Sequence, residues 1–239
     1  GAAGRADVVI LVTRWGAAVM PDFSLEDSAR AEGFAMIAGI DEAGRGPWAG
    51  PVVAAAVILD QAALPAALAE GLDDSKKLSA ARREALFALL PEFARIGVGR
   101  AEVDEIDRLN ILQATFLAMT RAAAALSSVP DLALVDGNRP PALACAVRCV
   151  VGGDGRARSS AAASGVAKVT RDRVMTELAL RHPGYGWERN AGYGTAEHQA
   201  ALARLGVTPA HRRSFKPVAA LLARGKQDVE SSDSKPGEM

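Results

Sequence analysis

The stretch MIAGIDEAGRGPWAGPVVAAAVIL, residues 36–59, decides the fold, because two apolar segments flank a turn rich in glycine and proline. Met36 to Ile40 and Val52 to Leu59 are short, apolar and rich in β-branched residues, as buried strands are. The intervening AGRGPWAGP favours a reversal of the chain. We therefore expect a first hairpin of two buried strands.

Helices and strands alternate after this hairpin. Ser79 can cap a helix through ARREALFALLPEF, and residues 109–126 combine helical spacing with strong helix formers. This order predicts an α/β domain whose mixed sheet is flanked by helices. The other expected elements are strands at 95–103, at 132–136 and ending at Val151, and helices at 159–182, 195–205 and 217–224.

The chain of 239 residues fits one globular domain, which we place at 34–224. Residues 1–33 lack sustained periodicity and are interpreted as an extension outside the core, with disorder expected in part of it. Residues 225–239, GKQDVESSDSKPGEM, are interpreted as a polar tail.

Composition excludes wholesale disorder and membrane spans, since 49% of the residues are hydrophobic and 23% are charged. The longest apolar run, Ala49 to Leu59, contains glycine and proline and is too short to cross a bilayer. The run from Val8 to Val12 falls short of a secretory signal. A cytoplasmic enzyme with no membrane partner is expected.

Net charge does not favour nucleic-acid binding, because 28 basic residues balance 28 acidic ones. Locally, however, basic residues outnumber acidic ones between Asp136 and Arg173. This imbalance predicts a basic surface around a few carboxylates. The basic residues of this segment are Arg139, Arg148, Arg156, Arg158, Lys168, Arg171 and Arg173.

Cysteines and histidines give no sign of a metal site of their own. Cys145 and Cys149 have no histidines near them in the sequence, so two free, buried thiols are expected. His182, His198 and His211 lack metalloprotease spacing and are assigned structural or surface roles.

Carboxylates recur at the ends of the expected strands: Asp41 and Glu42 after the first, Asp136 after LALVD and Asp154 beyond Val151. Gathered carboxylates repel one another unless cations neutralise them, and hard oxygen ligands suit Mg²⁺ or Mn²⁺. Two such ions about 4 Å apart can catalyse phosphodiester hydrolysis. Taken singly, each residue is better interpreted as a solvated turn residue. Neighbouring strand residues point to opposite faces, so Asp41 and Glu42 share a site only if the strand bends or ends there.

A series of motifs strengthens this interpretation, and together they resemble the ribonuclease HII family from Met36 to about Leu222. In family order they are GIDEAGRGPWAGPVVAAAV (39–57), DSKKLS (74–79), NILQAT (110–115), VDGNRP (135–140), AAASGVAKVTRD (161–172), GYGT (192–195) and HRRSF (211–215).

The resemblance implies a ribonuclease H-like fold with a helical C-terminal part. It also implies a monomeric endoribonuclease that hydrolyses the RNA strand of RNA–DNA hybrids and cuts duplex DNA on the 5′ side of embedded ribonucleotides. Its products would carry 3′-hydroxyl and 5′-phosphate ends, formed with two Mg²⁺ or Mn²⁺ ions. By resemblance, Asp41, Glu42, Asp136 and Asp154 are the catalytic metal ligands.

The resemblance further assigns substrate contacts. The backbone of Gly44, Arg45 and Gly46 is expected to approach the 2′-hydroxyl of the ribonucleotide, as glycine permits. Tyr193 is expected to help read that ribonucleotide. From the residues alone, the glycines suit an ordinary hairpin turn, which is compatible with sugar contact, and a buried loop filler is the preferred interpretation of Tyr193.

Other candidates would contact phosphates. Ser164, Lys168 and Arg171 are spaced by four and three residues, so they share one face of the expected helix. Ser75 and Lys76, in a loop, are similar candidates.

Three positions depart from the family pattern. Gly152 and Ala191 stand where lysines are common, and Gly165 replaces an aliphatic residue. We expect effects on phosphate affinity and on the packing of the long helix.

Two classes compete with this function. A binding module without metal would have no use for four clustered carboxylates. A ribonuclease HIII usually carries a sizeable extra N-terminal domain, for which the residues before Met36 are too few, whereas a DNA-processing resolvase stays an alternative.

Overall fold

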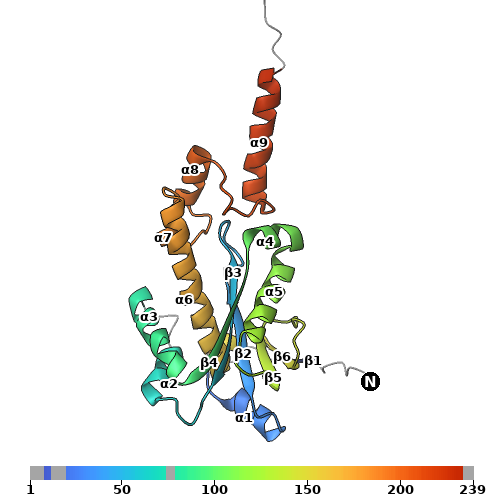
Figure 1. Cartoon of the computed structure of the whole chain (residues 1–239), viewed down its shortest axis with the longest axis vertical. Coiled ribbons are helices and arrows are strands. Elements are labelled where there is room, and N and C mark those ends of the chain that lie inside the picture. Colours follow the sequence, from blue (N-terminus) through green and yellow to red (C-terminus); the bar gives the residue numbers. More distant parts are fainter. Residues whose placement is uncertain (1–7, 12–19, 74–78, 234–239) are drawn as a thin grey trace, which may run out of the picture.

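The structure, a computed structural model, describes residues 8–11, 20–73 and 79–233. Within these residues, a six-stranded mixed sheet of order β1-β6-β5-β2-β3-β4 forms the centre (Figure 1). The strands are β1 (Val8–Leu11), β2 (Ile37–Ala43), β3 (Val52–Leu59), β4 (Ala94–Ala101), β5 (Leu132–Asp136) and β6 (Ala146–Val150).

The predicted hairpin is confirmed, since β2 and β3 pair antiparallel with Gly39 opposite Val57 and Ala43 opposite Val53. β4 extends this antiparallel part, whereas β5, β6 and β1 run parallel to β2. The sheet is therefore mixed, as expected from the order of elements.

Two long helices cover the two faces of the sheet. α5 (Ile111–Ala124) packs where Ala54 and Ala56 of β3 point, and α6 (Arg158–Arg181) packs where Ala55 and Val57 point. This alternation along β3 follows from the two-residue period of a strand. Burial on both faces explains why β3 is apolar at every position.

Further helices complete the domain. Ser79 caps α3 by accepting a hydrogen bond from the amide of Arg82 at 3.4 Å, as predicted. α4, α7 and the short α2 are not expected from the sequence. The bounds are α1 (Ser24–Ala31), α2 (Ala66–Asp73), α3 (Ala80–Leu89), η2 (Leu90–Glu92), α4 (Val103–Leu109), η3 (Gly153–Gly155), α7 (Trp187–Asn190), α8 (Ala196–Leu205) and α9 (Lys216–Asp233).

The departure at Gly165 has a packing partner in the structure. A Cβ atom built at this position would lie 1.7 Å from Cζ of Phe87, on α3. The ring of Phe87 thus occupies the space that an aliphatic side chain would need, so α3 and α6 pack together without a void at this position.

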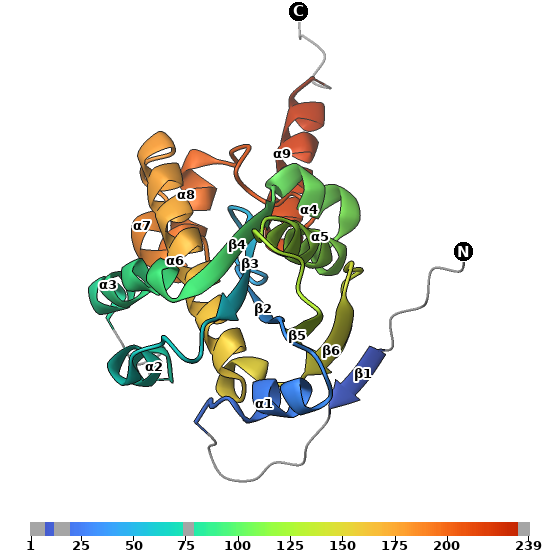
Figure 2. The same cartoon turned by 60° about the horizontal axis from the view of Figure 1, so that its bottom comes forward.

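The expectation that residues 1–33 lie outside the core is wrong for the part that the structure describes. Ala29 of α1 is fully buried in a cluster with Leu134 and Val150, and β1 forms the edge of the sheet beside β6 (Figure 2). Polar contacts add to this packing, because Glu32 forms a 2.7 Å ion pair with Arg148. Such tertiary contacts leave little trace in local periodicity.

The helix predicted at 217–224 is longer in the structure, because α9 runs from Lys216 to Asp233. α9 projects away from the body of the domain (Figure 1). In the described part of the chain, no helix is both long and apolar enough to cross a membrane.

Glu26 links α1 to the start of α6. Its side chain is 2% exposed, and its Oε1 accepts hydrogen bonds from the backbone amide and hydroxyl of Ser159, at 2.8 and 2.7 Å. The residue at the N-cap of α6 is Ala157, whose methyl group cannot accept a hydrogen bond. Glu26 therefore caps α6 from another helix.

We expect Glu26→Ala to lower the free energy of unfolding by about 1–3 kcal/mol, because it leaves two buried donors of Ser159 unpaired. Urea unfolding measures this loss. Asp27→Ala is the matched control, since its exposed ion pair with Arg30 contributes less than about 1 kcal/mol. Equal losses in both variants would show that Glu26 does not cap α6.

Candidate active site

Three carboxylates gather at one edge of the sheet. Asp41 comes from β2, Asp136 ends β5 and Asp154 lies in η3, and each offers an oxygen within 4.8 Å of the others. Asp41 lies 95 residues before Asp136 and 113 before Asp154 in the sequence, so only the fold brings all three together.

Strand pairing and one turn explain this convergence. β2 and β5 are parallel neighbours with Ile40 opposite Val135, so Asp41 and Asp136 follow at the same edge. The turn after β6 is tied to Asp136, whose Oδ1 accepts a hydrogen bond from the Gly153 amide at 3.0 Å. This contact brings the adjacent Asp154 to the other two carboxylates.

Electrostatics in this cluster favour a bound cation. Asp41 is 6% exposed, and burial, followed by the charges of Glu42 and Asp136, raises its pKa well above the usual value. Burial is also the main cause that raises the pKa of Asp136, and the charge of Asp154 adds to it. A divalent cation would offset this repulsion, and carboxylate oxygens are the ligands that Mg²⁺ and Mn²⁺ prefer.

Glu42 is placed differently from the other three predicted ligands. β2 continues to Ala43 instead of ending before Asp41, yet the side chain of Glu42 still interacts with that of Asp41. Glu42 lies outside the group of three and forms a 3.3 Å ion pair with Arg45. Burial still raises its pKa, and the charge of Asp136 contributes to this rise.

A cleft of about 500 Å³ adjoins the carboxylates and collects most of the predicted substrate contacts. Ser164 lies at its wall and also hydrogen-bonds Asp41 through its side chain, while Lys168 is exposed one helical turn further along α6. The predicted site residues that line the cleft are Glu42, Gly44, Ser164, Lys168, Arg171 and Tyr193. Ser75 and Lys76 lie outside the described residues.

The Gly44-Arg45-Gly46 segment follows β2 and meets Tyr193. Gly44 has a φ of +93°, and a Cβ atom there would lie 1.9 Å from Nε of Arg171, so its conformation and its close approach both require glycine. At Gly46 a Cβ atom would lie 3.4 Å from the ring of Tyr193. The loop and the tyrosine thus form one wall of the cleft.

Tyr193 is not a buried loop filler, because 50% of its surface is exposed. Its side chain is available to a ligand, whereas its backbone is tied down: the amide donates to the carbonyl of Asn190 at 2.9 Å, and the carbonyl accepts from the amide of Thr195 at 2.8 Å. This combination suits a recognition residue.

Arg171 occupies a different place from that expected for a phosphate contact. It is 2% exposed, and its guanidinium donates to the carbonyl oxygens of Ala49, Pro51 and Ala191 at 3.1, 3.0 and 2.9 Å. Burial lowers its pKa to about 10. A role in holding the walls of the cleft fits this placement better than contact with phosphate.

Arg212 does the same for the glycine segment, and the sequence does not single it out. It is fully buried, and Nη2 and Nη1 donate to the carbonyls of Gly44 at 2.6 Å and of Arg45 at 3.0 Å. An arginine in an apparently polar motif, HRRSF, gives no sign of burial. Arg171 and Arg212 together supply hydrogen-bond donors to the backbone carbonyl oxygens of the loop that follows β2.

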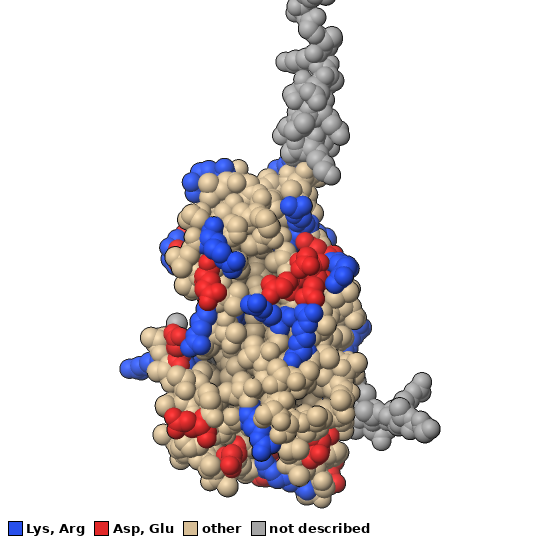
Figure 3. Space-filling view, in the orientation of Figure 1, with Lys and Arg blue, Asp and Glu red and all other residues tan. Residues whose placement is uncertain are grey.

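Among the basic residues of the segment 136–173, Arg139 and Lys168 are exposed, whereas several others are committed to contacts within the protein. Arg148 pairs with Glu32, Arg173 pairs with Glu84 at 2.8 Å, and Arg171 is buried. Figure 3 shows basic and acidic side chains interspersed on the face it presents, without a broad area of one sign.

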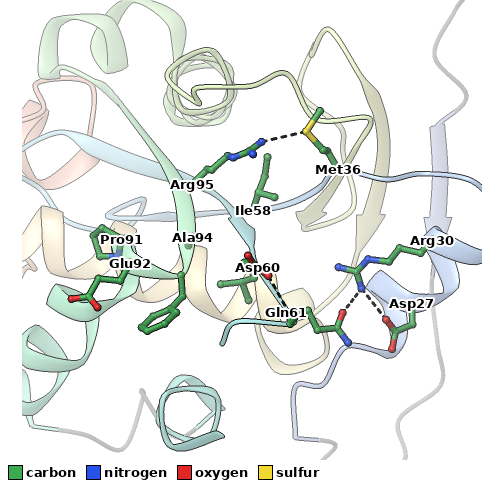
Figure 4. A pocket seen from close by; sticks show the side chains of 13 residues that line it. Asp27, Arg30, Met36, Ile58, Asp60, Gln61, Pro91, Glu92, Ala94 and Arg95 are labelled. Atoms are coloured by element: carbon green, nitrogen blue, oxygen red, sulfur yellow. Dashed lines mark hydrogen bonds and ion pairs between the residues drawn. The ribbon is translucent and has the colours of Figure 1, made fainter. Parts of the chain in front are cut away.

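A larger cavity, about 860 Å³, lies near the start of β2 and the end of β3 (Figure 4), and none of the three carboxylates lines it. Arg30 bonds Asp27 and Gln61, and Asp60 accepts hydrogen bonds from two backbone amides of the following turn. Its polar groups are thus committed to one another, and size alone does not mark the functional site.

The remaining expectations concern cysteine and histidine. Both cysteines are free, as predicted, although Cys145 is only partly buried. His198 and His211 are fully buried within an aromatic cluster that includes Tyr185 and Trp187, which confirms a structural placement for these two.

Comparisons with known proteins agree with this geometry. A family model described as ribonuclease HII matches residues 38–218. Ribonuclease HII of Paramagnetospirillum magneticum is 66% identical over 200 residues, covering 84% of this chain and 98% of the relative. Ribonuclease HII of Rhodospirillum rubrum is 63% identical over 207 residues, covering 86% of this chain and 93% of the relative.

Solved structures confirm the predicted ribonuclease H-like fold. Ribonuclease H2 from Pyrococcus horikoshii superposes with a TM-score of 0.69 at 27% identity, covering 81% of this chain and 100% of that chain. A ribonuclease HIII in complex with Mn²⁺ superposes with a TM-score of 0.65 over 84% of this chain and 73% of its own; at 21% identity it supports the fold alone.

Proposed function

Because this chain belongs to the ribonuclease HII family, and is thus a metal-dependent endoribonuclease acting on RNA–DNA hybrids, we propose that it also cuts duplex DNA on the 5′ side of embedded ribonucleotides. The observation that carries this proposal is a cleft that holds Gly44 and Tyr193 and whose wall residue Ser164 hydrogen-bonds Asp41, one of the three gathered carboxylates. The products would carry 3′-hydroxyl and 5′-phosphate ends.

The proposed metal ligands are Asp41, Asp136 and Asp154, with Glu42 as the fourth. Divalent cations held there would supply activation of the attacking water and neutralisation of charge on the leaving oxygen. Ser164 would keep the Asp41 carboxylate oriented through its hydrogen bond. One chain supplies every proposed ligand, so a monomer with two Mg²⁺ or Mn²⁺ ions suffices.

Specificity would come from the wall opposite the metals. The 2′-hydroxyl is the group that distinguishes a ribonucleotide from its DNA neighbours, so polar groups must be positioned around it. Arg171 fills the space beside Gly44, whereas at Gly46 only the exposed ring of Tyr193 lies within 4 Å of where a Cβ atom would be, so a sugar could approach the backbone there. Since the glycine segment directly follows Asp41 and Glu42, sugar recognition would align the scissile phosphate with the metal ligands.

A fluorescent DNA duplex with a single ribonucleotide tests the proposal. With Mg²⁺ or Mn²⁺ we expect one cut on the 5′ side, and none after chelation; a duplex entirely of DNA is the control for contaminating nucleases. Cleavage of an RNA–DNA hybrid but not of the single-ribonucleotide duplex would contradict the proposal.

A further prediction concerns Gly152 and Ala191, which stand where lysines are common in the family. Ala191 lines the cleft and already has a φ of +49°, whereas Gly152 is exposed, with a φ of +68° and nothing within 4 Å of where a Cβ atom would lie. Lysine at 152 would therefore cost about 1–2 kcal/mol of backbone strain, but both positions have room for it.

We expect Ala191→Lys and Gly152→Lys to tighten binding of the duplex and to steepen its salt dependence. Each new phosphate contact changes the slope of log affinity against log salt by roughly −0.9 on B-form DNA. Val129→Lys, at an exposed position near the opposite end of β5, is the control for added charge. Equal slopes in all three variants would show that positions 152 and 191 do not face phosphates.

A further inference from the structure

We propose that His198 and His211 act as one buried pair that positions Tyr193 in the cleft. This inference rests on the proposed role of Tyr193 in reading the ribonucleotide. It concerns two residues that lie beneath the cleft and touch neither the carboxylates nor the proposed substrate path.

The two imidazoles meet edge to edge inside the domain. Both residues are 0% exposed, and their Nε2 atoms are 3.1 Å apart. His198 belongs to α8 and His211 to the segment before α9, so the contact joins two parts of the C-terminal region. Because two nitrogens can bond only if one carries a hydrogen, the pair requires a defined arrangement of protons.

The neighbours of His211 determine its protonation. Its Nδ1 lies 3.0 Å from the backbone amide of Thr208, which can only donate. Nδ1 must therefore accept, and the hydrogen of the neutral ring sits on Nε2. His211 thus donates to His198.

The neighbours of His198 require the opposite arrangement. Its Nε2 lies 3.1 Å from Nε1 of Trp187, which is a donor, and faces the N–H of His211. Its Nδ1 lies 2.9 Å from the carbonyl oxygen of Tyr193, which can only accept. His198 therefore accepts at Nε2 and donates from Nδ1 to the backbone of Tyr193.

These assignments make one directed chain of hydrogen bonds from Thr208 through His211 and His198 to the carbonyl of Tyr193. A second proton on either ring would set two donors against each other. Burial accordingly lowers the pKa of His198, and burial together with His198 lowers the pKa of His211 to about 4. The pair stays neutral, and its hydrogen bonds keep one direction.

Trp48 holds the residues on either side of Tyr193. Its backbone amide donates to the carbonyl of Gly192 at 2.8 Å, and its ring lies where a Cβ atom of Gly194 would be, at 2.1 Å. Tyr193 is thus fixed at its own carbonyl and at both neighbours, while its ring stays exposed beside Gly46. A backbone held in this way keeps the ring in place without any contact to it.

Two substitutions of His198 separate the donor to Tyr193 from the acceptor for Trp187. The side-chain nitrogen of asparagine, a donor, is as many bonds from Cα as Nδ1, and the side-chain oxygen of glutamine, an acceptor, is as many bonds from Cα as Nε2. His198→Asn therefore retains a donor toward Tyr193, whereas His198→Gln loses it. We expect His198→Gln to lower cleavage at a single ribonucleotide by roughly tenfold to a hundredfold, with duplex binding nearly unchanged. His198→Asn should lose less cleavage at a similar melting temperature.

A double-mutant cycle with Tyr193→Ala tests whether the pair acts through Tyr193. If it does, His198→Gln causes little further loss of cleavage once Tyr193 is alanine, whereas a general structural effect adds to the loss. Melting temperatures, measured for all four proteins, show which are folded at the assay temperature. The inference would be overturned if the losses of cleavage in the two single variants added up in the double variant. It would also be overturned if His198→Asn were less active than His198→Gln. If Tyr193→Ala lowers cleavage but His198→Gln does not, the inference about the histidine pair is wrong while the proposed role of Tyr193 stands. If Tyr193→Ala is fully active, the proposed role of Tyr193 is wrong as well.

Discussion

Asp41→Asn is expected to abolish cleavage of an RNA–DNA hybrid while the protein stays folded. The substitution removes one negative ligand from the group of three carboxylates but hardly changes the volume of the side chain. Metal ions contribute several kcal/mol to such reactions, so we expect a loss of at least about a hundredfold in rate. Asp136→Asn should behave alike, and its Oδ1 can still accept the hydrogen bond from Gly153.

Stability should change in the opposite direction to activity. Asp41 is buried among like charges, and its raised pKa shows that the ionised form is disfavoured there. Without metal, the melting temperature of Asp41→Asn should therefore equal or exceed that of the wild type. Added Mn²⁺ should raise the melting temperature of the wild type by mass action and that of the variant much less.

Asp104→Asn on α4 is the matched control, because it makes the same chemical change at an exposed residue outside the cluster. It should leave both cleavage and the response to Mn²⁺ unchanged. Full activity of Asp41→Asn in Mg²⁺, with an intact circular dichroism spectrum, would refute the metal assignment.

Tyr193→Ala is expected to lower cleavage at a single ribonucleotide much more than it lowers binding of the duplex. The residue is half exposed and its backbone bonds do not depend on its ring, so truncation should hardly affect stability. The ring would act by placing the ribonucleotide against the glycine segment, and poor alignment of reacting groups can cost about a hundredfold.

Three measurements on one fluorescent duplex test this prediction: the cleavage rate, the dissociation constant and the melting temperature. Tyr193→Phe separates the hydroxyl from the ring, because it keeps the apolar surface beside Gly46. A structural tyrosine would lower stability, binding and cleavage together. A folded Tyr193→Ala that cuts the site as fast as the wild type would exclude a role in recognition.

Local pattern is enough to predict most of the sheet and its two covering helices. It places the strand LALVD at its observed bounds, 132–136, and likewise the strand from Val52 to Leu59. These elements are apolar throughout and end at charged or turn-forming residues. The sequence alone therefore shows both that the strands are buried and where they end. The predictions are wrong where a segment is mostly polar, as for α1 and the end of α9. A segment can be held by tertiary contacts, or can extend an existing helix, without a regular spacing of apolar residues.

The four carboxylates, the glycine segment and Tyr193 can all be named from the order of residue types and motifs along the chain. That Asp41, Asp136 and Asp154 meet, while Glu42 pairs with Arg45, depends on which strands are neighbours and on where β2 ends. The burial of Arg171, Arg212, His198 and His211 is likewise beyond prediction, since their partners are mostly backbone carbonyls and amides from distant segments. Every residue carries those same backbone groups, so the side-chain sequence cannot indicate which of them a buried cation or imidazole will meet.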